Sequence, residues 1–366
     1  MRIIGWLAGV VALLGMLALG GIGWHYSNQI LTPGGGGRPE PLLAVRSATA
    51  ATVTLERTEA SSRPGAYDLD DGDGGFAQIT DIVAWDTTTV SRSVDVLTGS
   101  IDAGERVSVG GYYYPADPAD AFDFRLREVR VDGDLGAFPA YLDEGAGPTW
   151  AILVHGRGAD RHEAFRMVGV LHGLGVPSLS ITYRNDAGAP ASPDGLYGLG
   201  STEWEDLEAA VDYAVEHGAR RLVLVGFSTG GQIVSTYLHH GDGGDLVEGV
   251  ILDAPVLDWG PVLRRAAVER GLPTFLTSVA MLVSQVRGIP WAEMDQIERA
   301  GEFDVPILLF HGTDDSTVPV ATSDVFARAR PDLVTYVRVE GAEHVQSWNV
   351  DPEAYADAVA DFIAAA

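Results

Sequence analysis

The chain of 366 residues contains no cysteine and no lysine. Without cysteine it can form no disulfide, thiolate metal site, iron–sulfur cluster or cysteine nucleophile. Without lysine it has no Schiff-base lysine, P-loop lysine or lysine general base. Its 24 basic residues are therefore all arginine, and 51 acidic residues bring the net charge to −27. Because proteins bind nucleic acid mainly through Lys and Arg contacts with phosphates, this charge argues against a nucleic-acid partner.

Charge is also missing near the start of the chain, since residues 3–24 hold no charged side chain. As a helix this segment would be about 33 Å long, enough to cross a hydrocarbon core of about 30 Å. Arg2 precedes it and the next basic residue is Arg38, which predicts that the N-terminus lies inside and the rest outside the cytoplasm. We therefore expect residues 1–31 to be a single-pass anchor in the cell membrane. The alternative is a signal peptide, with Ala18-Leu19-Gly20 as a poor cleavage site, and both interpretations export the protein.

Composition divides the rest of the chain into three parts. Residues 32–41 are rich in Gly and Pro, which is typical of a flexible linker. Residues 42–147 are expected to form a β-rich N-terminal region, with short β-like runs at 51–56, 79–85, 89–96, 106–109 and 126–131. Within this region, residues 68–74 are an acidic loop whose oxygen ligands do not have EF-hand spacing. We interpret that loop as a solvated turn rather than a calcium site.

Residues 148–366 alternate between apolar runs typical of strands and amphipathic segments typical of helices. This alternation predicts an α/β fold, with a mostly parallel central sheet covered by helices on both faces. The helix at 203–216 is expected to be capped by Thr202, with Glu205 completing a capping box. Residues 258–302 interrupt the rhythm, and we expect them to be a helical cap over the C-terminal edge of the sheet.

The residues with the clearest chemical pattern are Gly226-Phe227-Ser228-Thr229-Gly230, a G-x-S-x-G sequence between a predicted strand and a predicted helix. Small residues around the serine allow a sharp strand–turn–helix that exposes its hydroxyl. The turn also places Ser228 at a helix N-terminus, where the dipole favours a developing anion. The sequence therefore predicts that Ser228 is a nucleophile.

A serine hydroxyl needs a base, and the base needs an acid that orients it. His344 and Asp315 each follow a predicted strand, so both are expected at the sheet edge that carries Ser228. Asp314 and Asp253 are the alternatives for the acid. His311 is the alternative for the base, although it precedes the acid and opens the turn.

Four motifs in this order resemble the α/β-hydrolases, in the branch that includes esterases, lipases and serine-aminopeptidase-like enzymes. They are His155-Gly156 after a strand, the G-x-S-x-G turn, the H-G-x-x-D-x-x-V-P block at 311–319, and His344. The resemblance covers residues 149–363. Residues 180–193 and 252–259 also look like a bacterial subgroup of exported or membrane-linked hydrolases of unknown substrate.

The resemblance implies a catalytic triad of Ser228, His344 and Asp315, with the backbone N–H groups of Thr229 and Arg157 as oxyanion donors. It implies neither an organic cofactor nor a metal. The expected activity is hydrolysis of a small-molecule or lipid-like acyl ester through an acyl-enzyme. A serine peptidase and an acyltransferase on the same fold remain alternatives. So does a non-catalytic envelope-binding protein, or a role for residues 42–147 in capturing envelope material or a partner.

Overall fold

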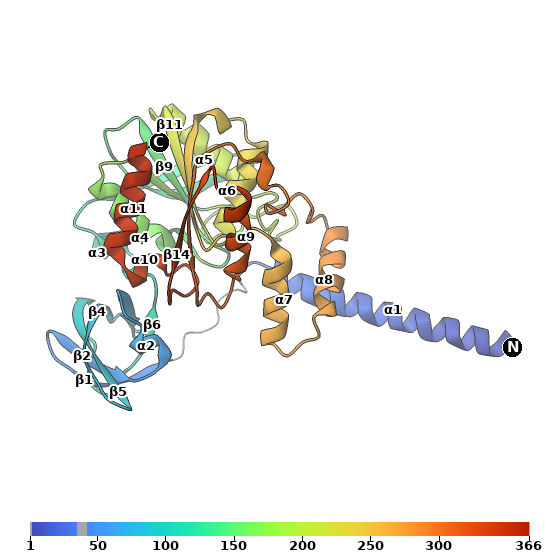
Figure 1. Cartoon of the computed structure of the whole chain (residues 1–366), viewed down its shortest axis with the longest axis horizontal. Helices are drawn as coiled ribbons and strands as arrows, with labels where there is room; N and C mark the ends of the chain where they lie inside the picture. The colour runs from blue at the N-terminus through green and yellow to red at the C-terminus, as the bar shows by residue number, and fades with distance from the viewer. Residues whose placement is uncertain (1, 35–41, 366) are drawn as a thin grey trace.

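The computed structural model describes residues 2–34 and 42–365, and the backbone alone for residues 2–12. Most of the predicted linker at 32–41 therefore lies outside the described residues. Figure 1 shows a layered α/β body, a small β-barrel beside it, and a helix that extends away from the body. The predicted α/β class is confirmed by this arrangement.

The small barrel contains the first six strands, joined in the order β1-β2-β5-β4-β3-β6 and closed on itself by antiparallel pairs. Their bounds are β1 (Leu43–Ala48), β2 (Thr52–Glu56), β3 (Tyr67–Asp70), β4 (Phe76–Trp85), β5 (Thr89–Thr98) and β6 (Arg106–Gly110). The alternation of apolar and polar residues turns every second side chain inward, so that Val53, Leu55 and Ile79 are fully buried. Residues 43–110 of the expected β-rich region thus form a closed barrel.

The acidic loop of the barrel is a turn held by its own backbone. The Asp71 carboxylate accepts hydrogen bonds from the amides of Asp73 (2.7 Å) and Gly75 (2.8 Å). No cluster of His, Cys, Asp or Glu within the described ranges could hold a metal ion. The interpretation of this loop as a turn agrees with these contacts.

The large sheet has eight strands in the order β14-β13-β12-β11-β9-β10-β8-β7. Its strands are β7 (Leu126–Gly133), β8 (Gly136–Asp143), β9 (Thr149–Val154), β10 (Ser178–Ile181), β11 (Arg221–Phe227), β12 (Val247–Asp253), β13 (Ile307–Gly312) and β14 (Val334–Val339). The strands from β14 to β10 are parallel, while β8 and β7 are antiparallel. Placing residues 126–147 with the N-terminal β-rich region was therefore wrong, because β7 and β8 extend the large sheet.

Helices cover both faces of this sheet, as predicted (Figure 1). One face packs against α5 (Trp204–Glu216), α6 (Thr229–His240) and α9 (Ala321–Ala329), and the other against α4 (Phe165–Gly173) and α11 (Pro352–Ala365). The prediction that the Thr202 side chain caps the N-terminus of α5, with Glu205 completing a capping box, was wrong. Glu203 is the N-cap residue of α5 and makes no side-chain cap, while the Thr202 hydroxyl lies 3.4 Å from the Glu203 carboxylate.

The barrel is attached to the body through α10 (Ser347–Val350). The amide of Ala66 donates to the carbonyl of Asn349 (2.8 Å), and the Asn349 side chain donates to the carbonyls of Ala66 (2.6 Å) and Gly111 (3.0 Å). Asn349 is fully buried, so these bonds are shielded from water. They join the barrel to the segment that follows His344.

The predicted helical cap consists of α7 (Trp259–Glu269) and α8 (Phe275–Val286). Both helices lie at the side of the body where α1 (Arg2–Leu31) leaves it (Figure 1). Large apolar side chains along α1 are exposed, namely Leu13, Leu14, Met16, Leu17, Leu19, Ile22 and Trp24.

The expected transmembrane anchor is not found. Among the helices of the described residues, none has both the length and the apolarity needed to cross a bilayer. The described part of α1 loses its apolar character after Trp24, because the helix continues through His25, Tyr26, Ser27, Asn28 and Gln29. The location of the chain in the cell stays a prediction.

Candidate active site

Ser228 lies in the sharp turn between β11 and α6, with φ of +51° and ψ of −116°. This left-handed conformation is strained for a residue with a side chain, and such strain is often found at functional positions. The turn is possible because Gly230 has no side chain, since a Cβ there would lie 2.0 Å from the carbonyl oxygen of Val154. The sequence therefore holds the Ser228 hydroxyl at the C-terminal edge of the sheet.

The structure brings the three predicted side chains into one hydrogen-bonded chain. His344 Nε2 lies 2.9 Å from Ser228 Oγ, and His344 Nδ1 lies 2.7 Å from Asp315 Oδ2. With the proton on Nδ1 donated to Asp315, Nε2 is free to accept the proton of the serine hydroxyl. This is the geometry that an activated serine requires.

Asp315 is held as an anion inside the protein. Its Oδ1 accepts the amides of Thr317 (2.8 Å) and Val318 (2.7 Å), while His311 Nε2 lies 3.2 Å from Oδ2. Burial opposes the charge on Asp315, but the nearby His344 and the hydrogen bonds from His311 and His344 outweigh it. The pKa of this carboxyl therefore lies well below its usual range.

His311, the alternative base, has a different place in the structure. It is fully buried, its Nδ1 lies 2.7 Å from the Ser323 hydroxyl, and its Nε2 faces Asp315 and the carbonyl of Val318. These contacts place it behind the acid and make it a positioning group for Asp315. The sequence carried a signal for this role, because the H-G-x-x-D spacing puts the histidine four residues before the acid.

The two alternative acids also lie elsewhere. Asp314 is exposed and accepts the hydroxyl of Thr313 (3.2 Å). Asp253 is buried and accepts the hydroxyl of Ser347 (2.8 Å), while its backbone carbonyl accepts the amide of Ser228 (3.0 Å). Neither side chain is hydrogen-bonded to His344 among the contacts of the described residues.

The electrostatics of His344 follow from its position between the serine and the acid. Burial favours the neutral ring, but the charge of Asp315 and its hydrogen bond to Nδ1 outweigh burial and raise the pKa of His344 above 6.5. Glu163 and Asp253 act in the same direction. The ring is therefore a stronger base than a free histidine, and it is neutral only above this raised pKa.

The two peptide groups that flank Gly156 are held by hydrogen bonds and lie next to Ser228. The amide of Gly156 donates to Glu163 Oε2 (2.6 Å), and its carbonyl accepts from His155 Nδ1 (2.9 Å) and the Tyr183 hydroxyl (3.1 Å). In a trans peptide the following N–H points away from the carbonyl, so the Arg157 N–H points away from His155 and Tyr183. A Cβ on Gly156 would lie 2.9 Å from Ser228 Cβ, which shows how closely this loop approaches the serine.

The amides of Arg157 and Thr229 are both available for a ligand. Thr229 is the first residue of α6, so its N–H has no acceptor within the helix. Among the backbone hydrogen bonds of the described residues outside helices and strands, neither amide is a donor. Their role as oxyanion donors stays a prediction, and this geometry is consistent with it.

The loop at 155–157 is supported by charges that the sequence did not indicate. His155 Nε2 donates to Asp186 (2.8 Å), and the ring stacks on Tyr183. Burial alone would lower the pKa of His155, but the Asp186 charge outweighs it and raises this pKa to about 9. His155 is therefore positively charged at neutral pH, and its Nδ1–H donates to the Gly156 carbonyl.

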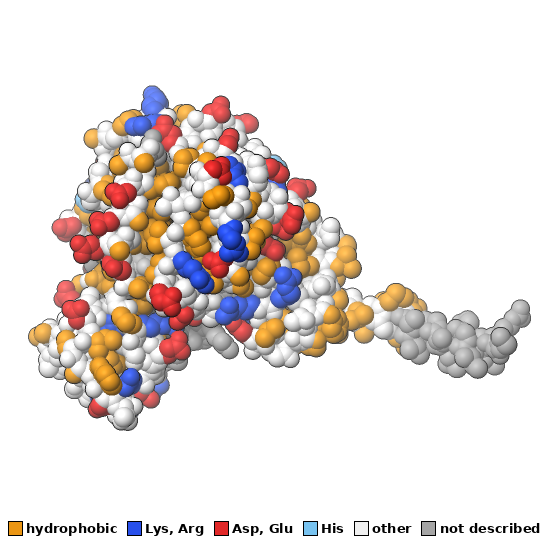
Figure 2. All heavy atoms as spheres, viewed as in Figure 1, with side chains coloured by type: hydrophobic (Ala, Val, Ile, Leu, Met, Phe, Trp, Pro, Cys, Tyr) orange, Lys and Arg blue, Asp and Glu red, His pale blue; other side chains and the backbone are white. Residues whose placement is uncertain are grey.

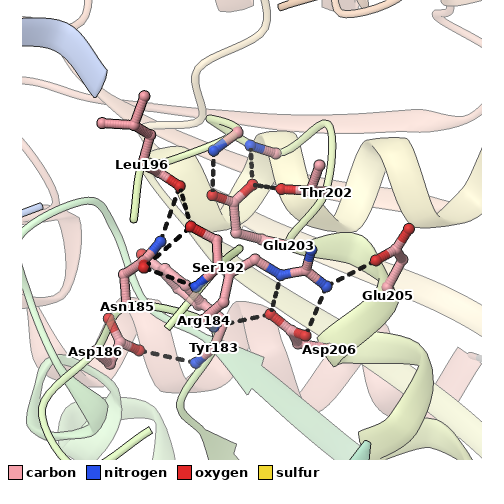
Figure 3. Close-up of polar contacts among 12 residues, drawn as sticks. Tyr183, Arg184, Asn185, Asp186, Ser192, Leu196, Thr202, Glu203, Glu205 and Asp206 are labelled. Atoms are coloured by element: carbon pink, nitrogen blue, oxygen red, sulfur yellow. Dashed lines mark hydrogen bonds and ion pairs between the residues drawn. The ribbon is translucent and has the colours of Figure 1, made fainter. Parts of the chain in front are cut away.

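Asp186 is fixed in turn by a polar network, shown in Figure 3. Its carboxylate accepts the amide of Tyr183 (2.8 Å), and the neighbouring Arg184 forms a bidentate pair with Asp206 at 2.8 Å. Glu203 accepts the amides of Gly198 (2.7 Å) and Gly200 (2.8 Å). These contacts hold residues 183–206 together, and with them Asp186, the partner of His155.

A cavity of about 870 Å³ opens next to Ser228 and His344. A volume of this size is typical of sites for small organic molecules. The cap helices α7 and α8 supply one wall through Val262, Leu263 and Leu276. A second wall comes from the end of α1, which the sequence analysis had not placed near the site.

The fold is similar to that of solved esterases. An esterase of Pyrococcus furiosus, Pf2001, is 18% identical and has a TM-score of 0.55, with 69% of this chain and 94% of that chain covered. Est1E from Butyrivibrio proteoclasticus, solved with ferulic acid bound, is 18% identical with a TM-score of 0.50 over 64% of this chain and 98% of that chain. The chain has the α/β-hydrolase fold.

Of two family matches, one coincides with the barrel and the other lies inside the hydrolase-fold body. Residues 43–110, the closed barrel, match a domain of unknown function (DUF8805), and residues 191–283 match a protein of unknown function (DUF1749). The uncharacterized protein Rv2307c of Mycobacterium tuberculosis is 26% identical over 239 residues, covering 62% of this chain and 73% of that protein.

Asp253 gives this hydrolase fold a pH-dependent stability. Burial raises its pKa from 3.8 to about 6, so the folded state holds a proton that the unfolded chain has released, and stability falls as pH rises through this range. Asp253→Asn keeps an acceptor for Ser347 and is expected to stabilise the fold above about pH 6, by about 2–3 kcal/mol. Urea unfolding at about pH 5 and about pH 8 checks this. The exposed Asp314→Asn is the control, and an effect of Asp253→Asn that is independent of pH would contradict the prediction.

Proposed function

We propose that this protein is a serine hydrolase that cleaves carboxylic esters through an acyl-enzyme on Ser228. The observation that carries the proposal is the chain of hydrogen bonds from Ser228 through His344 to the buried anion Asp315. The similarity of the fold to that of the esterase Pf2001 supports the same reaction class.

The first half of the proposed reaction forms the acyl-enzyme. Ser228 Oγ attacks the ester carbonyl carbon while its proton moves to His344 Nε2, and the carbonyl oxygen becomes an anion. The amides of Thr229 and Arg157 hold this anion, and Asp315 stabilises the imidazolium. When the tetrahedral intermediate collapses, the C–O bond breaks and His344 gives its proton to the departing alkoxide.

In the second half, water is the nucleophile and Ser228 is the leaving group. His344 takes a proton from a water molecule as its oxygen attacks the acyl carbon, and the same two amides hold the oxyanion again. The bond to Ser228 Oγ then breaks, His344 returns the proton to the serine, and the carboxylic acid leaves. Every proton transfer passes through His344 Nε2, which lies 2.9 Å from Ser228 Oγ.

The proposed substrate class is an acyl ester with an apolar part. The cavity beside Ser228 is lined by Val256, Trp259, Val262, Leu263 and Leu276 among others, which suits a lipophilic group. The net charge of −27 disfavours attraction of anionic macromolecules by the overall field.

Labelling with a fluorophosphonate tests the proposal, because this reagent phosphonylates only a serine that is activated as a nucleophile. The wild-type chain is expected to be labelled and to hydrolyse p-nitrophenyl esters, and Ser228→Ala is expected to do neither. Ser235→Ala is the control, since this hydroxyl donates to the carbonyl of Gly231 inside α6. A folded wild-type protein that is not labelled would refute an activated Ser228.

A further inference from the structure

Part of the cavity wall is formed by the end of the long N-terminal helix. We propose that residues 25–32, the last two turns of α1 and the residue that follows, are a specificity-determining wall, and that the apolar chain of the ester packs between this wall and the cap. This inference rests on the proposed hydrolysis at Ser228.

The end of α1 is part of the hydrolase body. Leu31 is 1% exposed and belongs to the main hydrophobic core, and Ser27 on the same face is fully buried. The backbone carbonyl of Leu31 accepts the amide of Tyr197 at 2.8 Å. Since both side-chain burial and a backbone hydrogen bond fix this end, it can serve as a rigid wall.

The cap holds α1 from the other side. The guanidinium of Arg287, which directly follows α8, donates to Ser27 Oγ (2.9 Å) and Asn28 Oδ1 (2.8 Å). It also lies 4.3 Å from the centre of the Trp24 ring. At Gly23 the helices touch, because a Cβ there would lie 2.7 Å from Val283 and 2.9 Å from Val279. These contacts hold α1 against α8, and both helices also contribute residues to the cavity lining.

The same end of α1 is connected to the reacting centre by Arg157. The guanidinium donates to the carbonyls of Gln29 (3.1 Å) and Thr32 (3.3 Å) and lies over the Tyr197 ring. Carbonyls at a helix C-terminus lack partners in the helix and attract a cation. The backbone N–H of Arg157 is the proposed oxyanion donor. Arg157 would therefore contact the wall through its side chain and the substrate carbonyl oxygen through its backbone.

Ser228, Ile30 of α1, and Val262 and Leu276 of the cap line one cavity, so α1 and the cap each contribute an apolar face to it. Figure 2 shows hydrophobic side chains gathered where α1 meets the cap. An ester whose carbonyl carbon lies at Ser228 would extend its chain between these faces, so the volume of residue 30 would decide which chains fit.

Chain-length profiles of the full chain test this inference, with p-nitrophenyl acetate, octanoate and dodecanoate as substrates. Ile30→Trp fills the cavity and is expected to lower kcat/KM for octanoate relative to acetate by at least about 10-fold, the scale of one or two methylene contacts. Ile30→Ala enlarges the cavity and is expected to shift the preference towards dodecanoate. Ile22→Trp is the matched control, because Ile22 is on the same helix, is exposed and does not line the cavity.

The outcomes separate this inference from the proposed function. Fluorophosphonate labelling at Ser228 with an unchanged chain-length profile in both Ile30 variants would overturn the wall alone. A wild-type chain that neither reacts with the probe nor hydrolyses any of the esters would overturn the proposed function and the wall with it. Opposite shifts by Ile30→Trp and Ile30→Ala, with none by Ile22→Trp, would support the wall.

Discussion

Replacing Ser228 with alanine is expected to lower kcat for ester hydrolysis by about 10⁶, and replacing His344 as well is expected to cost nothing further. The reason is that the two side chains act as one unit. His344 Nε2 accepts the proton of the attacking oxygen, so once that oxygen is absent the base has no proton to take. Steady-state kinetics of Ser228→Ala, His344→Ala and the double variant on one p-nitrophenyl ester measure this non-additivity.

The residual rate of these variants is expected to come from binding and from the amides of Arg157 and Thr229, which none of the changes removes. Far-ultraviolet circular dichroism and urea unfolding would establish that each variant is folded. A Ser228→Ala variant that kept more than about 1% of wild-type turnover would contradict the assignment. So would losses that multiply in the double variant, because independent groups lose rate independently.

The sequence predicted the body of the fold well because its signals there are local. Continuous apolar runs marked the buried parallel strands, as in β9 and β13. β8 was not predicted because Gly136 and Pro139 disturb its apolar pattern, and β3 was not predicted because it contains two aspartates. β7 was predicted as a strand but assigned to the wrong sheet, since a two-residue alternation does not say which sheet a strand joins.

The three candidate catalytic residues could also be predicted from the sequence. Ser228, Asp315 and His344 each follow a parallel strand, and parallel strands bring their C-terminal ends to one edge, so sequence order was enough to expect them together. Glu163 and Asp186 were not predicted because they act indirectly, through the backbone amide of Gly156 and the ring of His155. No local pattern marks such contacts.

The N-terminal helix shows the limit of a composition argument. Its apolar run suggested a membrane segment, and hydropathy says nothing about where the polar end of such a helix packs. The contacts of that end come from Arg157 and Arg287, which lie more than one hundred residues further along the chain. Only the folded arrangement of the cap and the loop at 155–157 brings them to α1.

Replacing Asp315 with asparagine is expected to lower kcat by about 10⁴ and to move the acid limb of the pH profile to lower pH. The wild-type profile of kcat/KM should rise as pH passes the pKa of His344, which the Asp315 charge raises above 6.5 against the effect of burial. Asparagine removes that charge and leaves burial, which favours the neutral ring. The imidazole would then stay unprotonated to lower pH, but without an anion at Nδ1 it would be poorly oriented and its charged form unsupported. Profiles of kcat/KM from about pH 5 to about pH 9 measure both effects.

The neighbouring Asp314 provides a matched control, because it has the same side chain and lies in the same loop but is exposed and contacts Thr313. Asp314→Asn is expected to leave kcat and the acid limb unchanged. If Asp314→Asn moved the limb and Asp315→Asn did not, the acid would have been assigned to the wrong residue. If Asp315→Asn lowered kcat without moving the limb, the carboxylate would act by shaping the loop rather than by its charge. The pair of variants therefore separates the electrostatic role of Asp315, which its contact of 2.7 Å with His344 supports, from a structural one.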